Sequence, residues 1–537
     1  MNRIVRFLAN IRGNDKRRAL QKVFDQSSRE LRMNLEQHAR SIEKFTTSEG
    51  ILLGTTSGIH ESVEIRLPRG DENAHWLNQG ATGTGKTTWQ SHIFQQKFQH
   101  GFCGGMDCKS GQHQNLVRII AGHGLTLDPE SAEALRRQTM IINPFSSALA
   151  PLNICRLLPG YTAEFQAYEL ALALRRLFQG ELTAHAETLL RYLLILLMEA
   201  GLSLVEAPTL LQNEVLRGVL AMRSANAAVK EFFLRTYSAL PQVSKDSLLN
   251  RLGSLLLPEN LRLMLGADDL VDFRSAFEDG KLLLVFLGKG PSVPEEQVNV
   301  LGSLILQLVF QATYARAEGK RQPYLLAIDE FTNLLEGTAL ANRFATALTA
   351  ARSFGLQLML SHHSFVQVPS ALRQTLVANA DLVSVFRTGA DSAAAFGDFM
   401  PDSDIEQMRK AYAAGHSLSK TALKCDQLEA VQRLPNREFF WYDRRSINRS
   451  IRLRTPDFIP PHQRLGMPEK LFEELIEEQG WTRGAIGVPR EELRRQISDR
   501  HERLHQMLRP SIDVRSESEP ERSKERPAGK SRRPRLG

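Results

Sequence analysis

One short glycine-rich stretch constrains the fold of this chain more than any other feature. Residues 80–88 read Gly-Ala-Thr-Gly-Thr-Gly-Lys-Thr-Thr and match the pattern G-x-x-x-x-G-K-[ST], with an extra glycine inside and a second threonine after it. Glycines let successive backbone N–H groups point at one anion, and a helix that starts at the loop adds its positive end. The residues that follow, to Gln96, read as such a helix. The pattern therefore predicts a nucleotide phosphate-binding loop.

Each residue of this loop has a predicted role toward ATP and Mg²⁺. Lys86 is expected to reach the β- and γ-phosphates, and the Thr87 hydroxyl is expected to bind Mg²⁺. The other residues are expected to surround the phosphates: Gly80, Ala81, Thr82, Gly83, Thr84, Gly85 and Thr88. ATP and Mg²⁺ are therefore the predicted ligands of the loop.

A second motif follows far along the chain, at the end of the apolar run 324–328. Asp329 and Glu330 come directly after this run, so a buried strand would place two carboxylates at its C-terminal end. Asp329 is predicted to hold Mg²⁺, and Glu330 is predicted to polarise the attacking water. Strands that simply end in acidic residues are common, but the phosphate loop upstream makes ATP hydrolysis the better interpretation.

Two elements further on could act on the γ-phosphate. Arg352 precedes an apolar strand at 356–360 and is predicted to reach the nucleotide of a neighbouring subunit; a plain surface arginine is the alternative. That strand runs into His362 and His363, whose side chains would point to opposite faces, which argues against a shared zinc ion. One of the two is predicted to sense the γ-phosphate. We assign this role to His363, although the sequence does not separate it from His362.

Strand and helix patterns alternate around these motifs, which favours an α/β core with a mainly parallel sheet. The unbroken apolar run 281–287 predicts a central buried strand, and 439–442 with 451–453 predict a closing antiparallel pair. Between about residues 160 and 267 the pattern is helical instead, which indicates an all-α insertion. The predicted organisation is a basic helical segment at 1–46, the ATPase core at 47–157 and 271–462, the all-α domain at 158–270, a helical segment at 463–509, and a disordered basic tail at 510–537.

Composition limits where this chain works and with what. The net charge is +8, and residues 509–537 contribute half of it, with nine Lys/Arg and five Asp/Glu among serines and prolines. A folded part that is only mildly basic permits DNA binding without requiring it. The four cysteines are scattered, and no apolar run approaches the ~20 residues that cross a bilayer. We therefore expect a cytoplasmic protein with no membrane span of its own.

Taken together, the motifs resemble those of the TraD/TraG group of type IV secretion coupling proteins, within the FtsK/HerA class of DNA-pumping ATPases. The resemblance covers roughly residues 51–458 and includes the order of the motifs. Besides the two nucleotide motifs and the helical insertion, it rests on Met106–Gly111, Ile142–Pro144, Gly280-Lys281 with the strand that follows, Arg352 with Gly355, and Ser364 with Gln367. Two features differ from the family: N-terminal transmembrane helices are lacking, and His363 stands where the family has glutamine.

This resemblance implies a RecA-like P-loop core and an ATP-driven DNA translocase. The active form would be a homo-hexameric ring with ATP at the subunit interfaces and DNA in the channel. Lys86, Thr87, Asp329 and Glu330 would act within one subunit, and Arg352 across an interface. A relaxase or a secretion-channel component would be a partner, and any contact with the inner membrane would run through partners. Three alternatives stay open: a soluble HerA-like translocase of repair or defence, a secretion ATPase that moves protein, and a nucleotide-gated scaffold that hydrolyses slowly.

Overall fold

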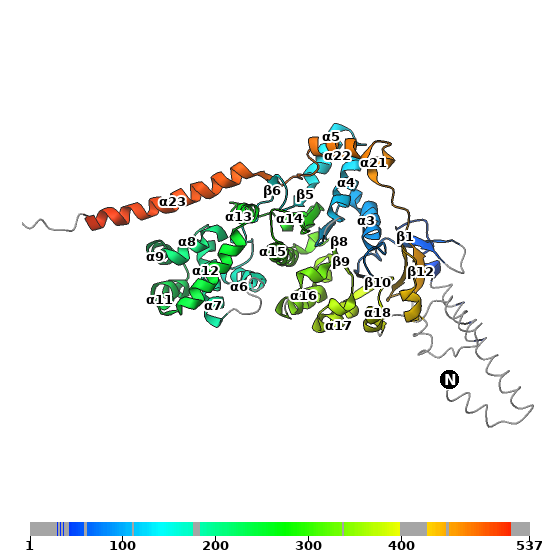
Figure 1. Cartoon of the computed structure of the whole chain (residues 1–537), viewed down its shortest axis with the longest axis horizontal. Helices are drawn as coiled ribbons and strands as arrows, with labels where there is room; N and C mark the ends of the chain where they lie inside the picture. Colours follow the sequence, from blue (N-terminus) through cyan, green and yellow to red (C-terminus); the bar gives the residue numbers. More distant parts are fainter. Residues whose placement is uncertain are drawn as a thin grey trace, which may run out of the picture.

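A mixed β-sheet organises the described part of the chain (Figure 1). The computed structural model describes residues 42–57, 62–109, 112–174, 183–335, 338–397, 427–446 and 450–516, together with Arg29, Met33 and Glu36. Within these residues the sheet has eleven strands in the order β2-β1-β12-β11-β10-β3-β9-β8-β4-β7-β5. Their bounds are β1 Ile51–Thr56, β2 Glu64–Leu67, β3 His75–Gln79, β4 Cys103–Asp107, β5 Thr139–Ile142, β7 Leu282–Phe286, β8 Tyr324–Asp329, β9 Leu356–His362, β10 Ala380–Phe386, β11 Glu438–Asp443 and β12 Ile451–Arg454.

The strands from β10 to β5 in this order all run parallel. The four others form an antiparallel extension in which β11 pairs with both β10 and β12, and β1 with both β12 and β2. The parallel strands are mostly apolar and almost entirely buried, as expected for strands with helices on both faces. The predicted α/β class with a mainly parallel sheet is confirmed, and β11 with β12 is the predicted closing pair.

Helices cover both faces of the sheet (Figure 1). One face carries α3 Lys86–Lys97, η1 Phe98–His100, α4 Gln112–Gly124 and α5 Pro129–Gln138. The other carries α14 Phe273–Glu278, α15 Glu295–Tyr314, α16 Thr338–Ala351 and α17 Ser370–Asn379; short connecting elements are η5 Glu318–Lys320, η6 Phe331–Leu334, η7 Arg352–Phe354, η8 Phe365–Gln367 and α18 Ala390–Gly397. Helix α15 is buried on nearly all sides because it lies between the sheet and the helical part of the chain.

Strand β7, predicted to be central, lies next to the edge strand β5 instead. Its residues Leu282–Val285 are nevertheless buried, because β4 and β5 flank it and helices cover it. An unbroken apolar run therefore indicates burial on both faces, but not the position of the strand in the sheet.

Every described residue that is assigned to a regular element between 163 and 265 is helical. The helices are α6 Ala163–Leu174, α7 Ala184–Glu199, η3 Leu204–Glu206, α8 Ala207–Gln212, α9 Glu214–Arg223, α10 Ala227–Glu231, the π-helix η4 Phe232–Thr236, α11 Tyr237–Ala239, α12 Gln242–Leu256 and α13 Glu259–Leu265. Side chains that favour helix starts cap several of them; Thr183 accepts from the Ala186 N–H, and Asn213 from that of Leu216. We propose that residues 158–270 form an inserted helical domain.

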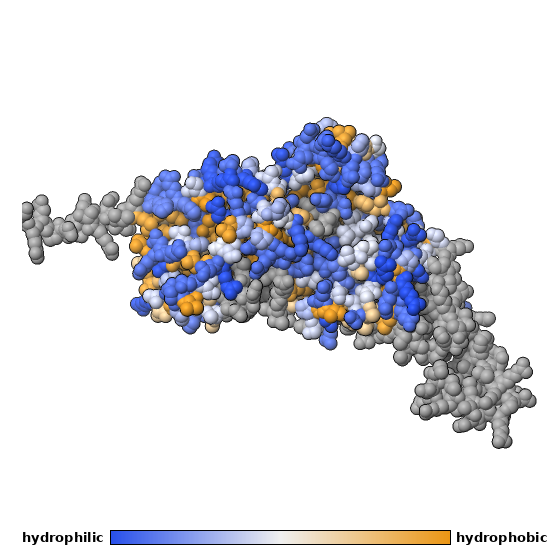
Figure 2. Space-filling view, viewed as in Figure 1, coloured by the Kyte–Doolittle hydropathy of each residue, from blue (hydrophilic) through white to orange (hydrophobic). Residues whose placement is uncertain are grey.

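The visible face of the molecule is mostly hydrophilic, with apolar residues scattered over it (Figure 2). Among the described residues, most large apolar side chains that remain exposed belong to the helical part. Val215, Met222 and Leu234 are three of these, and they line a shallow groove between α9 and η4. Scattered exposure of this kind is normal for a folded protein.

The C-terminal segment runs across both parts of the molecule. Helices α21 Pro461–Arg464 and α22 Glu469–Glu478 lie beside α4, β13 Val488–Pro489 pairs with β6 Ala148–Leu149, and α23 Arg490–Ser516 packs on α9 and α13. Helix α23 is anchored by buried Arg500, which contacts the carboxylates of Glu206 and Asp268.

Helix α23 also corrects a predicted boundary. The tail from residue 510 was predicted to be disordered, but α23 continues through Ser516. Extending an existing helix adds one hydrogen bond for each residue that is fixed. A helix that is already docked can therefore continue into residues whose composition alone predicts disorder. The predictions for residues 1–41 and 517–537 fall almost wholly outside the described residues. Among the residues described, no helix combines the length and apolar character needed to cross a bilayer.

Candidate active site

Four neighbouring parallel strands place all but one of the predicted site residues at a common edge of the sheet. At their C-terminal ends, β3 leads into the phosphate loop and β9 into His363. The neighbouring β8 ends in Asp329 and leads into Glu330, and β4 leads into Lys109. The register aligns these ends, since Gln79 pairs with His362, and Asp107 with Asp329. The C-terminal edge of a parallel sheet is where open α/β folds bind ligands.

The phosphate loop owes its course to its glycines. Gly83 and Gly85 have φ values of 75° and 107°, in the left-handed region that other residues rarely adopt. A Cβ atom on Gly80 would lie 2.5 Å from Cβ of Phe386, so the loop passes β10 too closely for any side chain. The loop is also held from outside, because the Arg437 N–H donates to the Thr84 carbonyl at 2.8 Å. These contacts keep an anion-binding curve at the start of α3.

Lys86, the first residue of α3, is almost completely buried. Its ammonium group donates to the carbonyl oxygens of Gly80 and Ala81 and lies 3.1 Å from Nδ1 of His363. Burial lowers the pKa of Lys86 to about 8, against the opposing charges of Asp329 and Glu330. The ammonium therefore lacks enough negative charge around it, and a phosphate would supply it.

Thr87 and Asp329 meet as the predicted magnesium site requires. The Thr87 hydroxyl donates to Oδ2 of Asp329 at 3.0 Å. Burial and the neighbouring Asp107 raise the pKa of Asp329. The two buried carboxyl groups belong to residues that pair across the adjacent strands β4 and β8. Hydroxyl and carboxylate oxygens are the donors that Mg²⁺ binds while it keeps several waters. The residues present therefore fit this ion.

Glu330 follows β8 in a left-handed backbone conformation, with φ 53° and ψ 50°. This turn aims its buried carboxylate at His363, whose Nε2 lies 2.8 Å from Oε2, and at the Thr332 hydroxyl, which donates to Oε1 at 2.9 Å. Burial raises the pKa of Glu330, but the hydrogen bond and charge of His363 outweigh it, and the net pKa is lowered. The carboxylate is therefore ionised at neutral pH and can accept a proton from water.

The structure separates the two histidines. His362 is fully buried between Phe331 and Phe365, and burial lowers its pKa to about 3. His363 points the other way, into the site, where its ring lies beside Lys86 and Glu330. Of the two, it is therefore His363 that faces the phosphate loop, as adjacent residues of a strand face opposite sides.

Arg352 is the predicted site residue that lies elsewhere. It precedes β9, whereas the phosphate site follows the other end of this strand. The seven residues of β9 separate the two places by about 23 Å at ~3.3 Å per residue. The half-exposed Arg352 guanidinium pairs with Asp381 at 2.8 Å. Arg352 therefore cannot reach the phosphates of its own subunit.

One residue of this site was not predicted from the sequence. Lys109, which follows β4, places its ammonium group 2.7 Å from Nε2 of His363. The stretch 106–111 had been singled out only as part of the family resemblance. A lysine shortly after a predicted strand is a weak signal, because nothing local shows which other strand ends lie beside it.

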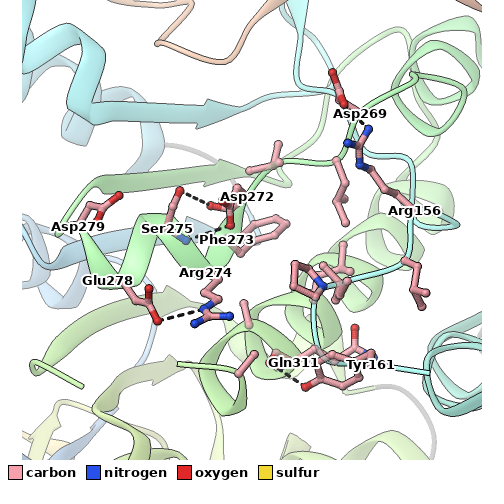
Figure 3. A pocket seen from close by; sticks show the side chains of 18 of the residues that line it. Arg156, Tyr161, Asp269, Asp272, Phe273, Arg274, Ser275, Glu278, Asp279 and Gln311 are labelled. Atoms are coloured by element: carbon pink, nitrogen blue, oxygen red, sulfur yellow. Dashed lines mark hydrogen bonds and ion pairs between the residues drawn. The ribbon is translucent and has the colours of Figure 1, made fainter. Parts of the chain in front are cut away.

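A separate cavity of about 480 Å³ lies at the junction of the helical part and the core (Figure 3). Its walls come from the segments where the chain leaves the core and returns to it, and from α15. Two ion pairs are drawn there: Arg156 contacts Asp269, and Arg274 donates to Glu278 at 3.0 Å. Tyr161 ties the departing segment to α15 by donating to the Gln311 carbonyl. This cavity shares no residue with the phosphate site.

Comparison with known proteins identifies a shared fold. No family model matches the sequence, and no curated protein matches it either. Among solved structures, VirB4 of Thermoanaerobacter pseudethanolicus superposes with a TM-score of 0.50 at 12% identity, over 77% of this chain and 97% of that chain. The chain shares its fold with VirB4. This confirms the predicted fold, a RecA-like P-loop core with a mainly parallel sheet.

Two further solved structures are similar at slightly lower scores. The bacterial conjugative coupling protein TrwB matches with a TM-score of 0.49 at 17% identity, over 78% of this chain and 92% of that chain. Its complex with ADP and Mg²⁺ matches with the same TM-score and identity, over 78% and 93%.

Proposed function

We propose that this chain is a P-loop ATPase that couples ATP hydrolysis to the movement of DNA through a homo-hexameric ring. The observation that carries the ATPase part is the meeting of Thr87 and Asp329 at 3.0 Å, between Lys86 and Glu330. These side chains come from a loop and a strand more than two hundred residues apart, in the arrangement that phosphoryl transfer uses. The DNA and ring parts rest on the motif order that resembles coupling proteins.

Within one subunit the residues divide the chemistry among them. The backbone of residues 80–88 and the Lys86 ammonium bind the phosphates, and Thr87 with Asp329 would hold Mg²⁺. That ion, when bound, neutralises charge on the phosphate oxygens. Glu330, ionised and buried, orients a water molecule and accepts its proton. Hydrogen-bonded parallel strands fix the backbone that carries these groups before ATP binds.

We assign Arg352 to the active site of a neighbouring subunit. Its position at the opposite edge of the sheet excludes a role at its own phosphates and leaves it half-exposed. In a ring, one edge of each subunit can face the nucleotide of the next, which is how an arginine finger acts in trans. The Asp381 carboxylate holds the guanidinium until a phosphate competes for it.

The experiment that tests the whole proposal measures phosphate release with no DNA, with single-stranded DNA and with double-stranded DNA, alongside the particle mass. A six-subunit particle whose turnover rises severalfold with either DNA is the expected result. Stimulation should weaken as salt rises, because phosphate contacts release counterions. A six-subunit ATPase that neither binds nor responds to DNA would favour a motor that moves protein. Slow, DNA-independent turnover by a monomer would favour a nucleotide-gated scaffold.

A further inference from the structure

Two lysines from different parts of the chain, one at the start of α3 and one just after β4, converge on the ring of His363. The Lys86 ammonium lies 3.1 Å from Nδ1, and the Lys109 ammonium lies 2.7 Å from Nε2. The Glu330 carboxylate lies 2.8 Å from the same Nε2 atom. The ring thus stands between two cations and one anion, beside the phosphate loop.

The ring cannot satisfy all three neighbours. A neutral imidazole has one N–H donor and one acceptor nitrogen. With the proton on Nε2, that N–H lies beside the Glu330 carboxylate and Nδ1 accepts from Lys86, and the Lys109 ammonium then faces an N–H group. With the proton on Nδ1, the ring accepts from Lys109, but its N–H then faces the Lys86 ammonium and Glu330 loses its donor. Lys86 keeps the Gly80 and Ala81 carbonyls as acceptors in both forms, but in neither form does the ring satisfy all of its neighbours.

No described carboxylate supplies an acceptor for Lys109. Among the residues the structure describes, its ammonium forms no ion pair, and His363 is the group it contacts. Its positive charge also adds to the burial that lowers the pKa of Lys86. Two ammonium groups that contact the two nitrogens of one ring favour an anion at the site.

The backbone of Lys109 is fixed, so the side chain starts from a defined place. Its N–H donates to Oδ1 of Asp107 at 3.0 Å, and its carbonyl accepts from the Lys289 N–H at 3.3 Å. The side chain itself is exposed and free to follow a ligand. The side chain comes from a residue just after β4. In the strand order, β8 with Glu330 lies between β4 and the strands that lead to His363 and the phosphate loop.

We propose that Lys109 is a second lysine for the terminal phosphate of ATP, and that His363 occupies this place until a triphosphate displaces it. The inference rests on the proposed ATPase function. The phosphate loop and Lys86 surround the phosphates that ADP also carries, whereas Lys109 approaches from the side where water attacks. Lys109 therefore distinguishes ATP from ADP, and its contact with the γ-phosphate frees the Glu330 carboxylate from His363.

The test compares the affinities of Lys109→Met, Lys86→Met and Lys470→Met for magnesium complexes of ADP and of adenylyl-imidodiphosphate, by titration calorimetry. Lys470 is the matched control, since it is an exposed lysine on α22. Loss of a charge-assisted hydrogen bond predicts that Lys109→Met binds the triphosphate analogue about 10- to 100-fold more weakly. Its ADP affinity should stay within twofold of the wild-type value, Lys86→Met should lose affinity for both nucleotides, and the control should match the wild type.

The outcomes separate this inference from the function on which it rests. If wild-type protein binds both nucleotides and depends on Lys86, an unchanged analogue affinity in Lys109→Met overturns the inference alone. An equal loss for ADP and the analogue also overturns it, because Lys109 would then act on the inner phosphates. If wild-type protein binds neither nucleotide, the proposed function and the inference both fail.

Discussion

Replacing Glu330 by glutamine gives the sharpest test of the assigned chemistry, because this change removes a charge and little else. Glutamine has the same length and shape, and its amide oxygen can still accept from the Thr332 hydroxyl, now 2.9 Å away. The left-handed backbone at this position is unaltered by the substitution. What is lost is the ionised carboxylate, whose lowered pKa keeps it deprotonated at neutral pH.

The expected magnitudes follow from this geometry. Losing a positioned general base lowers turnover by about 10²- to 10⁴-fold. Retained hydrogen bonds limit the change in unfolding free energy to about 1 kcal/mol. ATP affinity should stay within about threefold, since the backbone of the loop and Lys86 hold the phosphates in the proposed arrangement, and Glu330 acts on the water. The variant should therefore hold ATP without hydrolysing it.

The assay pairs steady-state phosphate release with the binding of unhydrolysed ATP to the purified protein. Glu72→Gln, which removes a carboxylate paired with Lys97 away from the site, is the matched control and should turn over normally. Turnover of Glu330→Gln within threefold of the wild-type rate would remove this residue from the chemistry. Loss of ATP binding would mean that the carboxylate supports the phosphate loop rather than the water.

Three other predictions test assembly, proton linkage and stability. Because phosphate favours the charged form of Lys86, whose pKa is about 8, nucleotide binding should take up protons above pH 8; calorimetric heats that do not depend on buffer ionisation at pH 8.5 would contradict this. Arg352→Ala should bind ATP but not hydrolyse it, and mixing it with Glu330→Gln should restore turnover above the sum of the two; mixed rings that stay inactive would exclude a role in trans. Glu206→Gln should cost about 3 kcal/mol near pH 7, since it breaks a buried pair with Arg500. The pKa of Glu206 is lowered on balance, because His501, Arg500 and Ser203 outweigh its burial, so this stability is present above the unfolded pKa of about 4.3 and is lost as the pH falls through the folded value. Urea unfolding that shows the same deficit at pH 7 and below pH 4 would refute this assignment.

The two nucleotide motifs could be recognised from the sequence because each is local. A glycine loop between a strand and a helix needs only neighbouring residues, and so does a buried strand that ends in Asp329-Glu330. The residue types in the two motifs also indicate their chemistry, since phosphoryl transfer requires backbone N–H groups, one lysine and two carboxylates. The α/β class follows from the same local patterns, because strands that alternate with helices form parallel sheets.

The order of the strands, by contrast, is decided by packing between segments that are distant in the sequence. No local pattern shows that β4 lies beside β8, and this neighbourhood alone brings Lys109 to the active site. The same holds for Arg352, since only the direction of β9 shows that it lies at the edge away from its own phosphates. His362 and His363 are equivalent in the sequence until one face of β9 is covered by Phe331 and Phe365. The sequence thus determined which groups are candidates for the chemistry, and the tertiary structure decided which of them meet, because burial and strand order are properties of the whole sheet.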